Sequence, residues 1–197
     1  MSQAANFLLT WKEEGFRVEE MRTTGAPKKK GSEAELYDYA VKALGRKMRT
    51  VAELKRLMRM RVPEEHGAEW IESVVVRLKE QKYLNDTEYA AAFSRMRVDN
   101  QRFGKRRVQQ ELMTKGVHME IIEKAVHAQF EGKNEAAMAR QYLVRKRVAK
   151  PKDEKEKARV MRMLMRAGYS SGAIFKTLKG WGLEAEEVEA AEGLDSL

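Results

Sequence analysis

The chain has 197 residues, of which 39 are Lys or Arg and 30 are Asp or Glu, so its formal net charge is +9. It contains no cysteine, which excludes disulfides, thiol nucleophiles and cysteine-based zinc sites. The sequence predicts no signal peptide and no run of the roughly 18 apolar residues that a spanning helix needs, so we expect a cytoplasmic protein.

Residues 1–31 are predicted to be an N-terminal extension and linker. Their apolar residues follow no clean helical period, and Gly25, Pro27 and three lysines at 28–30 mark the linker. On composition alone, the extension either docks on the unit that follows or becomes ordered only with a partner.

Residues 32–84 are predicted to form a first unit of three helices. Two helix starts have the capping-box pattern, Ser32 with Glu35 and Thr50 with Glu53. Apolar residues at helical spacing predict the buried faces of the three helices. These faces are Leu36, Ala40, Leu44 and Met48, then Leu54, Leu57 and Met58, then Trp70, Ile71, Val74, Val75 and Leu78.

Residues 85–131 are predicted to form a second unit of the same kind. Asn85 can cap its first helix, Gly104 opens its second helix, and Gly116 lies where a left-handed residue would end that helix. A third, apolar helix follows at once.

The unit recurs along the chain, which predicts a third copy over residues 132–180. An offset of 52 residues relates Val108 to Val160, Leu112 to Leu164, Gly116 to Gly168, Val117 to Tyr169, Ile122 to Ile174 and Val126 to Leu178. Moving back 55 residues takes Leu112 to Leu57 and Gly116 to Arg61, so the first copy is less regular. The period predicts an all-α fold of three tandem three-helix repeats that form an elongated, curved array.

Residues 181–197 form an acidic tail. Six acids and no Lys or Arg follow Gly180, so the first 179 residues carry a charge of +15. A field of that sign attracts polyanions such as nucleic acid or an acidic protein surface.

The second unit carries a family resemblance. Its pattern is Tyr83-Leu84-Asn85-Asp86-x-x-Tyr89-Ala90, then Arg102-x-Gly104-x-x-Arg107-Val108-x-x-Glu111-Leu112-x-x-Lys115-Gly116-Val117. This pattern resembles the central signature of the RecX family of recombinase regulators, and Arg162-x-Leu164-x-x-Ala167-Gly168-Tyr169-Ser170 is similar to that family's closing repeat.

The resemblance covers roughly residues 33 to 180, with two departures. The family usually has two aspartates where this chain has Asn85-Asp86, and residues 63–67 are an insertion. The resemblance implies a protein that binds the RecA recombinase filament in its helical groove. It also implies inhibition of ATPase, strand-exchange and coprotease activities in recombination, DNA repair and the SOS response.

Basic residues gather near the first turn and second helix of each unit, and we expect them to contact a partner or DNA. They are Arg56, Arg59 and Arg61, then Arg95, Arg97, Arg102, Lys105, Arg106, Arg107 and Lys115, then Arg145, Lys146, Arg147, Lys150 and Lys152. The alternative interpretation is a set of solvated helix faces partly paired with nearby glutamates. Guanidinium groups suit phosphates and carboxylates equally well. Phe103 lies within the basic loop, so it could stack on a base or fill an apolar partner pocket.

The sequence predicts neither an enzyme nor a cofactor site. His66, His118 and His127 lack metal-ligand spacing, and there is no glycine-rich phosphate loop or nucleophile motif. Glu111 and Glu120 are interpreted as surface charge.

Three functional hypotheses follow. The first is a monomeric regulator of the RecA filament, with single- and double-stranded DNA as further candidate partners. The second is a general DNA-binding protein of tandem helix-turn-helix-like units, although the helix over residues 118–129 offers only Lys124 as a strong cation. The third is a helical scaffold for an unrelated partner.

Overall fold

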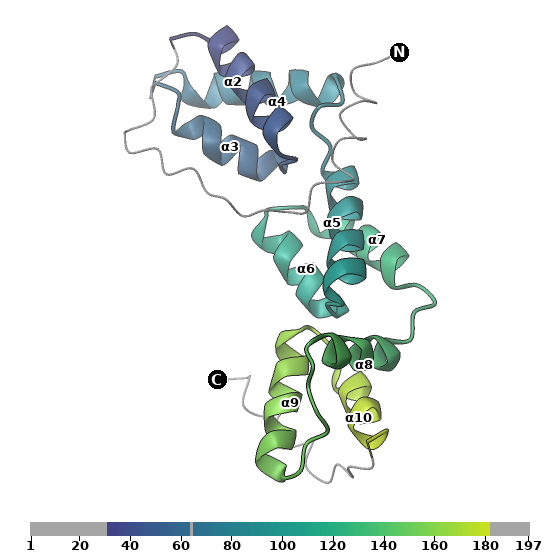
Figure 1. Cartoon of the computed structure of the whole chain (residues 1–197). Coiled ribbons are helices and arrows are strands. Elements are labelled where there is room, and N and C mark those ends of the chain that lie inside the picture. Colours follow the sequence, from purple (N-terminus) through teal and green to yellow (C-terminus); the bar gives the residue numbers. More distant parts are fainter. Residues whose placement is uncertain (1–30, 64, 182–197) are drawn as a thin grey trace. The chain divides into compact units, whose positions relative to one another are not determined.

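The structure is a computed structural model that describes residues 31–63 and 65–181, and these residues form helices and connections but no strand (Figure 1). The helices fall into three consecutive triplets. They are α2 (Glu33–Arg46), α3 (Val51–Arg59) and α4 (Gly67–Glu80), then α5 (Asp86–Gln101), α6 (Lys105–Thr114) and α7 (Met119–Phe130), then α8 (Glu135–Arg145), α9 (Glu154–Arg166) and α10 (Ser171–Lys179). The predicted all-α fold of three-helix repeats is confirmed, while the N-terminal extension to residue 30 and the tail from residue 182 lie outside the described residues.

Side-chain caps explain where several helices begin. The predicted capping box at α3 is confirmed: Thr50 Oγ1 accepts from the Glu53 backbone N–H at 3.0 Å, and the Glu53 carboxylate accepts from the Thr50 N–H at 3.3 Å. At α2, Ser32 caps the Glu35 N–H, but the Glu35 carboxylate accepts from the Gly31 N–H. The predicted box at Ser32 is therefore wrong in its second bond, because this carboxylate reaches one residue further back.

Left-handed glycines end α6 and α9, as the sequence predicts. Gly116 has a φ of +75° and Gly168 a φ of +89°, values that side chains with a Cβ rarely adopt. After Gly168, the Tyr169 N–H donates to the Leu164 carbonyl and so completes the Schellman turn.

The described residues form two compact parts, which differ from the three repeats. The first compact part contains the residues up to Tyr89 together with Lys115–Val117. Its three helices α2, α3 and α4 pack against one another. They bury Leu36, Ala40, Ala43, Leu44, Leu54, Met58, Val62, Ile71, Val74, Val75, Leu78 and Leu84. The predicted faces match this core except at three positions. Met48 lies beyond the end of α2 and is half-buried because that helix stops at Arg46. Leu57 is half-buried and lies outside the core, and Trp70 is half-buried and packs against it.

The buried residues of the second helices correct the register of the first repeat. Val108 and Leu112 of α6 are buried, and at an offset of 52 so are Val160 and Leu164 of α9. In α3 the buried residues are Leu54 and Met58, which lie 54 residues before their α6 counterparts. The offset of 55 that paired Leu112 with Leu57 is therefore wrong by one residue. The buried residues of α3 and α6 give the alignment of the two repeats, and the turn that follows each helix does not.

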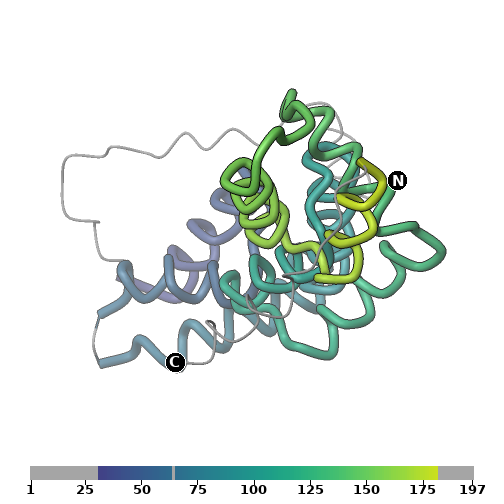
Figure 2. The backbone as a smooth tube through the Cα atoms, turned by 90° about the horizontal axis from the view of Figure 1, so that it is seen from below, coloured from purple at the N-terminus to yellow at the C-terminus, as the bar shows by residue number. Residues whose placement is uncertain are grey.

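The second compact part contains Ala90–Thr114 and the described residues from His118 onward, so it includes most of the second repeat and the described third repeat. Within it α6 packs on α7, and α10 packs on both α8 and α9. The yellow-green end of the tube in Figure 2 follows α8, α9 and α10. The two groups of buried apolar residues are Ala90, Phe93, Val98, Val108, Leu112, Ile122 and Val126, then Ala136, Met138, Ala139, Tyr142, Leu143, Val160, Leu164, Ala167, Tyr169, Ala173, Ile174 and Leu178.

Candidate basic interaction surface

The second and third repeats are joined through their backbones where α6 begins and α9 ends. The Gly104 N–H donates to the Ala167 carbonyl at 2.8 Å, and the Arg106 N–H donates to the Gly168 carbonyl at 3.2 Å. A Cβ at position 104 would overlap the Gly168 carbonyl, and one at position 168 would overlap the Arg107 backbone. Only glycine at both positions allows the two chain segments to approach so closely.

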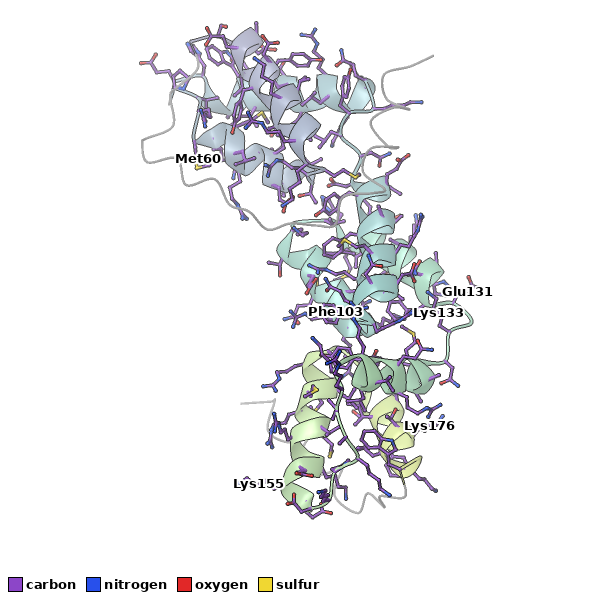
Figure 3. All side chains as sticks on the ribbon, in the orientation of Figure 1. Met60, Phe103, Glu131, Lys133, Lys155 and Lys176 are labelled. Atoms are coloured by element: carbon purple, nitrogen blue, oxygen red, sulfur yellow. The ribbon has the colours of Figure 1, made fainter. Side chains whose placement is uncertain are left out.

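Aromatic residues secure the same joint. The Phe103 and Tyr142 ring centroids are 6.4 Å apart, and those of Tyr142 and Tyr169 are 6.0 Å apart. The Tyr169 hydroxyl donates to the Arg102 carbonyl. Burial, followed by the effects of Tyr142 and Glu135, raises the pKa of Tyr169, so this hydroxyl keeps its proton. Phe103 is half-buried at the end of α5 and is a packing residue as well as a candidate contact (Figure 3).

Glu111 binds two of the predicted site arginines. Its carboxylate oxygens lie 2.7 Å from Nε of Arg97 and 2.7 Å from Nε of Arg107. Both guanidinium groups lie over the Phe103 ring, and Arg107 Nη1 donates to the Arg166 carbonyl at 3.3 Å. The Glu111 side chain is only 18% exposed. Its interpretation as surface charge is therefore wrong, and these two arginines have structural roles in the joint.

The first turn of α6 has an unusual charge. It holds Lys105, Arg106 and Arg107 and no acid, and among the described helices no other first turn has cations without an acid. A cation at a helix N-terminus costs about 0.3–1 kcal/mol, because the helix dipole is positive there. The carbonyls at the end of α9 offset part of this cost. Lys105 and Arg106 are exposed and form no ion pair within the described residues, so their charges are available to a partner.

The third repeat carries the largest exposed cluster. Arg145, Lys146, Arg147, Lys150 and Lys152 are all exposed around the end of α8 and the connection to α9. Arg147 has a φ of +53°, in a Schellman turn that closes with the Val148 N–H on the Leu143 carbonyl at 3.0 Å. An Arg in a place that favours glycine costs about 1 kcal/mol, and the cation near the helix C-terminus recovers part of that cost.

In the first compact part, some of the predicted site residues are exposed and others are held by contacts within the fold. Arg56 and Arg59 are exposed, while the Arg61 guanidinium lies 4.6 Å from the Tyr39 ring centroid. Lys115 is held in place, since its Nζ lies 2.8 Å from the Glu53 carboxylate and its carbonyl accepts from Thr50 Oγ1 at 2.7 Å. Burial is the main cause that lowers the pKa of the neighbouring Lys47.

Ten of the sixteen predicted residues are thus exposed and six are half-buried. The exposed residues are Arg56, Arg59, Arg95, Lys105, Arg106, Arg145, Lys146, Arg147, Lys150 and Lys152. The half-buried residues are Arg61, Arg97, Arg102, Phe103, Arg107 and Lys115. Sequence reasoning missed the exposed arginines of α9, Arg159, Arg162 and Arg166. The repeat offset of 52 would have found one of them, because it takes Arg107 to Arg159.

Two further properties concern the described part of the chain. It has no cluster of three or more His, Cys, Asp or Glu side chains that could hold a metal ion. None of its helices is both long enough and apolar enough to cross a membrane.

Comparison with known proteins agrees with this architecture. Residues 85–126 match the model of the second three-helix domain of RecX, and residues 134–178 match that of the third. The chain is also similar to a crystal structure of regulatory protein RecX, with a TM-score of 0.63, 23% identity and coverage of 75% of this chain and 71% of that one. This likeness shows that the two share a fold.

Curated relatives with the name regulatory protein RecX include proteins from three different bacteria. A Thermus thermophilus protein is 32% identical over 81% of this chain and 97% of its own length, and a Thermobifida fusca protein is 33% identical over 84% and 90%. An Oceanobacillus iheyensis protein is 30% identical over 70% of this chain, which spans 50% of that relative. By its repeats and its relatives, the chain belongs to the RecX family of regulatory proteins.

Proposed function

We propose that this protein binds the RecA recombinase filament as a monomer in the cytoplasm and inhibits its ATPase, strand-exchange and coprotease activities. Membership of a family named for regulation supports a regulatory role. The basic residues of the second and third repeats would contact acidic surface of the filament. Several modest contacts along successive subunits would then act together through avidity.

The observation that carries the proposal is the first turn of α6. Lys105 and Arg106 are exposed at a helix N-terminus where they cost stability, although an acid there would cost nothing. Residues that break a local rule in this way often serve binding. The joint between α6 and α9 holds that turn rigidly and so presents the two cations in a fixed geometry.

A general DNA-binding role has weaker support. Reading of a DNA groove by a helix-turn-helix unit needs a basic recognition helix. The third helix of the second repeat, α7, carries Lys124, which pairs with Glu120 at 2.8 Å, and the same helix exposes Glu123. Its surface therefore does not favour insertion between phosphate strands.

The test is inhibition of the DNA-dependent ATPase of the cognate RecA on single-stranded DNA, titrated with this protein. Binding to the same DNA without RecA is measured in parallel. We expect half-maximal inhibition at a concentration well below that needed to coat bare DNA. Inhibition only where the DNA is already saturated would mean simple competition for DNA and would overturn filament binding.

A double charge reversal localises the effect. Lys105→Glu with Arg106→Glu should abolish inhibition while the helical circular dichroism signal is unchanged. This pair spares Arg107 and Arg102, which the joint needs. The matched control is Lys42→Glu with Lys82→Glu, which makes the same charge change at exposed lysines of the first unit and should inhibit like the parent chain.

A further inference from the structure

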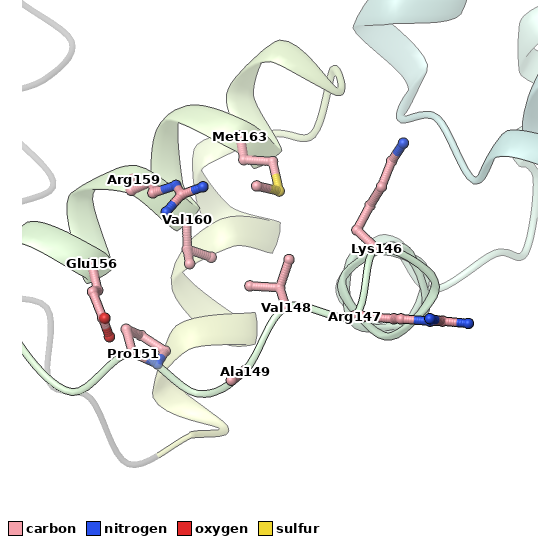
Figure 4. Close-up of a pocket in the computed structure, with 9 residues that line it drawn as sticks. All are labelled: Lys146, Arg147, Val148, Ala149, Pro151, Glu156, Arg159, Val160 and Met163. Atoms are coloured by element: carbon pink, nitrogen blue, oxygen red, sulfur yellow. The ribbon is translucent and has the colours of Figure 1, made fainter.

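The third repeat has an open groove beside its basic cluster. The groove has a volume of about 320 Å³ and lies between the α8–α9 connection and α9 (Figure 4). Its apolar lining is Val148, Ala149, Pro151, Val160 and Met163, and its charged lining is Lys146, Arg147, Glu156 and Arg159. Figure 4 shows the Val148 side chain pointing toward Val160 and Met163.

The second repeat fills the equivalent position. At the offset of 52, Arg159 and Met163 correspond to Arg107 and Glu111, and Val148 follows the left-handed Arg147 as Phe103 follows the left-handed Arg102. Phe103 therefore stands at the chain position that Val148 has in the third repeat, and the Arg107 guanidinium lies over its ring. Valine is much smaller than phenylalanine, so the third repeat leaves the place open.

The charges at the rim select for an acidic occupant. Arg159 and Lys146 are exposed and form no ion pair within the described residues, although Lys146 Nζ lies 5.8 Å from the Tyr142 ring centroid. Glu156 is the one acid of the lining, and its carboxylate already accepts from the Lys152 backbone N–H at 2.8 Å. An incoming carboxylate would meet unpaired cations over an apolar floor.

We propose that this groove binds an acidic segment of the protein that the chain regulates. The segment inserts one aliphatic or aromatic side chain between Val148, Val160 and Met163 and places flanking carboxylates on Arg159 and Lys146. The apolar floor favours a protein segment over DNA, because a phosphodiester backbone has no side chain to bury there. The inference rests on the proposed function and adds a defined anchor to it.

The test fills the groove with the residue that the second repeat uses. Val148→Phe keeps the net charge and should raise the concentration for half-maximal ATPase inhibition about tenfold, because a buried anchor is lost. The matched control is Val144→Phe, the same change at a side chain of α8 that is 74% exposed and outside the groove lining. It should inhibit like the parent chain. Thermal melting of both variants checks folding, and Arg159→Glu provides a second groove variant on the surface.

Each outcome either supports the groove or overturns it. Weaker inhibition by Val148→Phe and Arg159→Glu, with unchanged affinity for bare DNA, supports the proposal. Unchanged inhibition by both overturns the groove and leaves the proposed function intact. A parallel loss of bare-DNA affinity makes DNA the occupant and overturns it. Stronger inhibition would make the acidic residues 182–197 the occupant and also overturn it. A parent chain that does not inhibit overturns both proposals.

Discussion

The N-terminal ends of α3 and α6 both contact the end of another helix, but the first turn of α3 carries an acid and the first turn of α6 carries cations. Each meets the glycine-containing end of a second helix, Lys115-Gly116 at α3 and Ala167-Gly168 at α6. At α3, Thr50 supplies a capping box and Glu53 pairs with Lys115. At α6, Gly104 has no side chain to cap the helix, and backbone carbonyls of the next repeat accept its N–H bonds.

The charged residues at the α3 contact stabilise the fold, whereas those at the α6 contact are exposed to a partner. At α3 the charges are satisfied inside the fold, so Lys115 has little freedom to meet a partner. At α6 the backbone closes the contact, and Lys105 and Arg106 remain exposed. A contact with the end of another helix is thus closed by side chains at α3, and at α6 it is closed by the backbone and leaves cations exposed.

The largest effect should come from Gly168→Ala at the α6 contact. The new Cβ would overlap the Arg107 backbone, which cannot move without breaking the Gly104 and Arg106 hydrogen bonds, and the φ of +89° adds strain. We expect a loss of about 3 kcal/mol in the free energy of unfolding, measured by urea denaturation.

Gly132→Ala is the control for backbone strain alone. Its φ is +68°, but no atom lies within 4 Å of the position that a Cβ would take. It should lose about 1 kcal/mol. Equal losses at positions 132 and 168 would show that the close approach of α6 and α9 contributes nothing.

A smaller and reversible effect is expected from Gly116→Ala at the α3 contact. Here the added Cβ would overlap the Cβ of Ala52, a single methyl group rather than backbone. We expect a loss of about 2 kcal/mol, of which Ala52→Gly in the same chain restores the steric part. Because Ala52→Gly inside α3 itself costs about 1 kcal/mol, the single and double variants are compared in a double-mutant cycle. A double variant whose loss equals the sum of the two single losses would contradict this distinction between side-chain and backbone obstruction.

The repeat pattern made much of this architecture predictable, because helix starts and buried faces are local properties. Val108, Leu112 and Gly116 were enough to place Val160 and Leu164 in α9 and Gly168 just after it. The roles of Glu111 and Phe103 could not be predicted, since each depends on which groups α5, α6 and α8 bring together. The groove was also beyond sequence reasoning, because its volume depends on the path of the connection from Val148 to Pro151.

The smallest expected change in the free energy of unfolding comes from a charge change at the N-terminus of α6. Its sign distinguishes a structural role of the charge from a role in binding. Lys105→Glu places an acid in the first turn of α6, where the helix dipole favours it. We therefore expect the free energy of unfolding to rise by about 0.5 kcal/mol while inhibition of the recombinase weakens. Urea denaturation and the ATPase titration measure the two quantities on the same preparation.

Glu53→Lys is the opposite change at α3. It removes the capping box and the ion pair with Lys115 and brings two cations together, so it should lower the free energy of unfolding by about 2 kcal/mol. If Lys105→Glu instead destabilised the protein by a comparable amount, the α6 cations would be structural, as Glu53 is at α3. A gain in stability with a loss of inhibition would show that Lys105 is kept for binding at a cost to the fold, because only selection for function favours a residue that opposes its own helix.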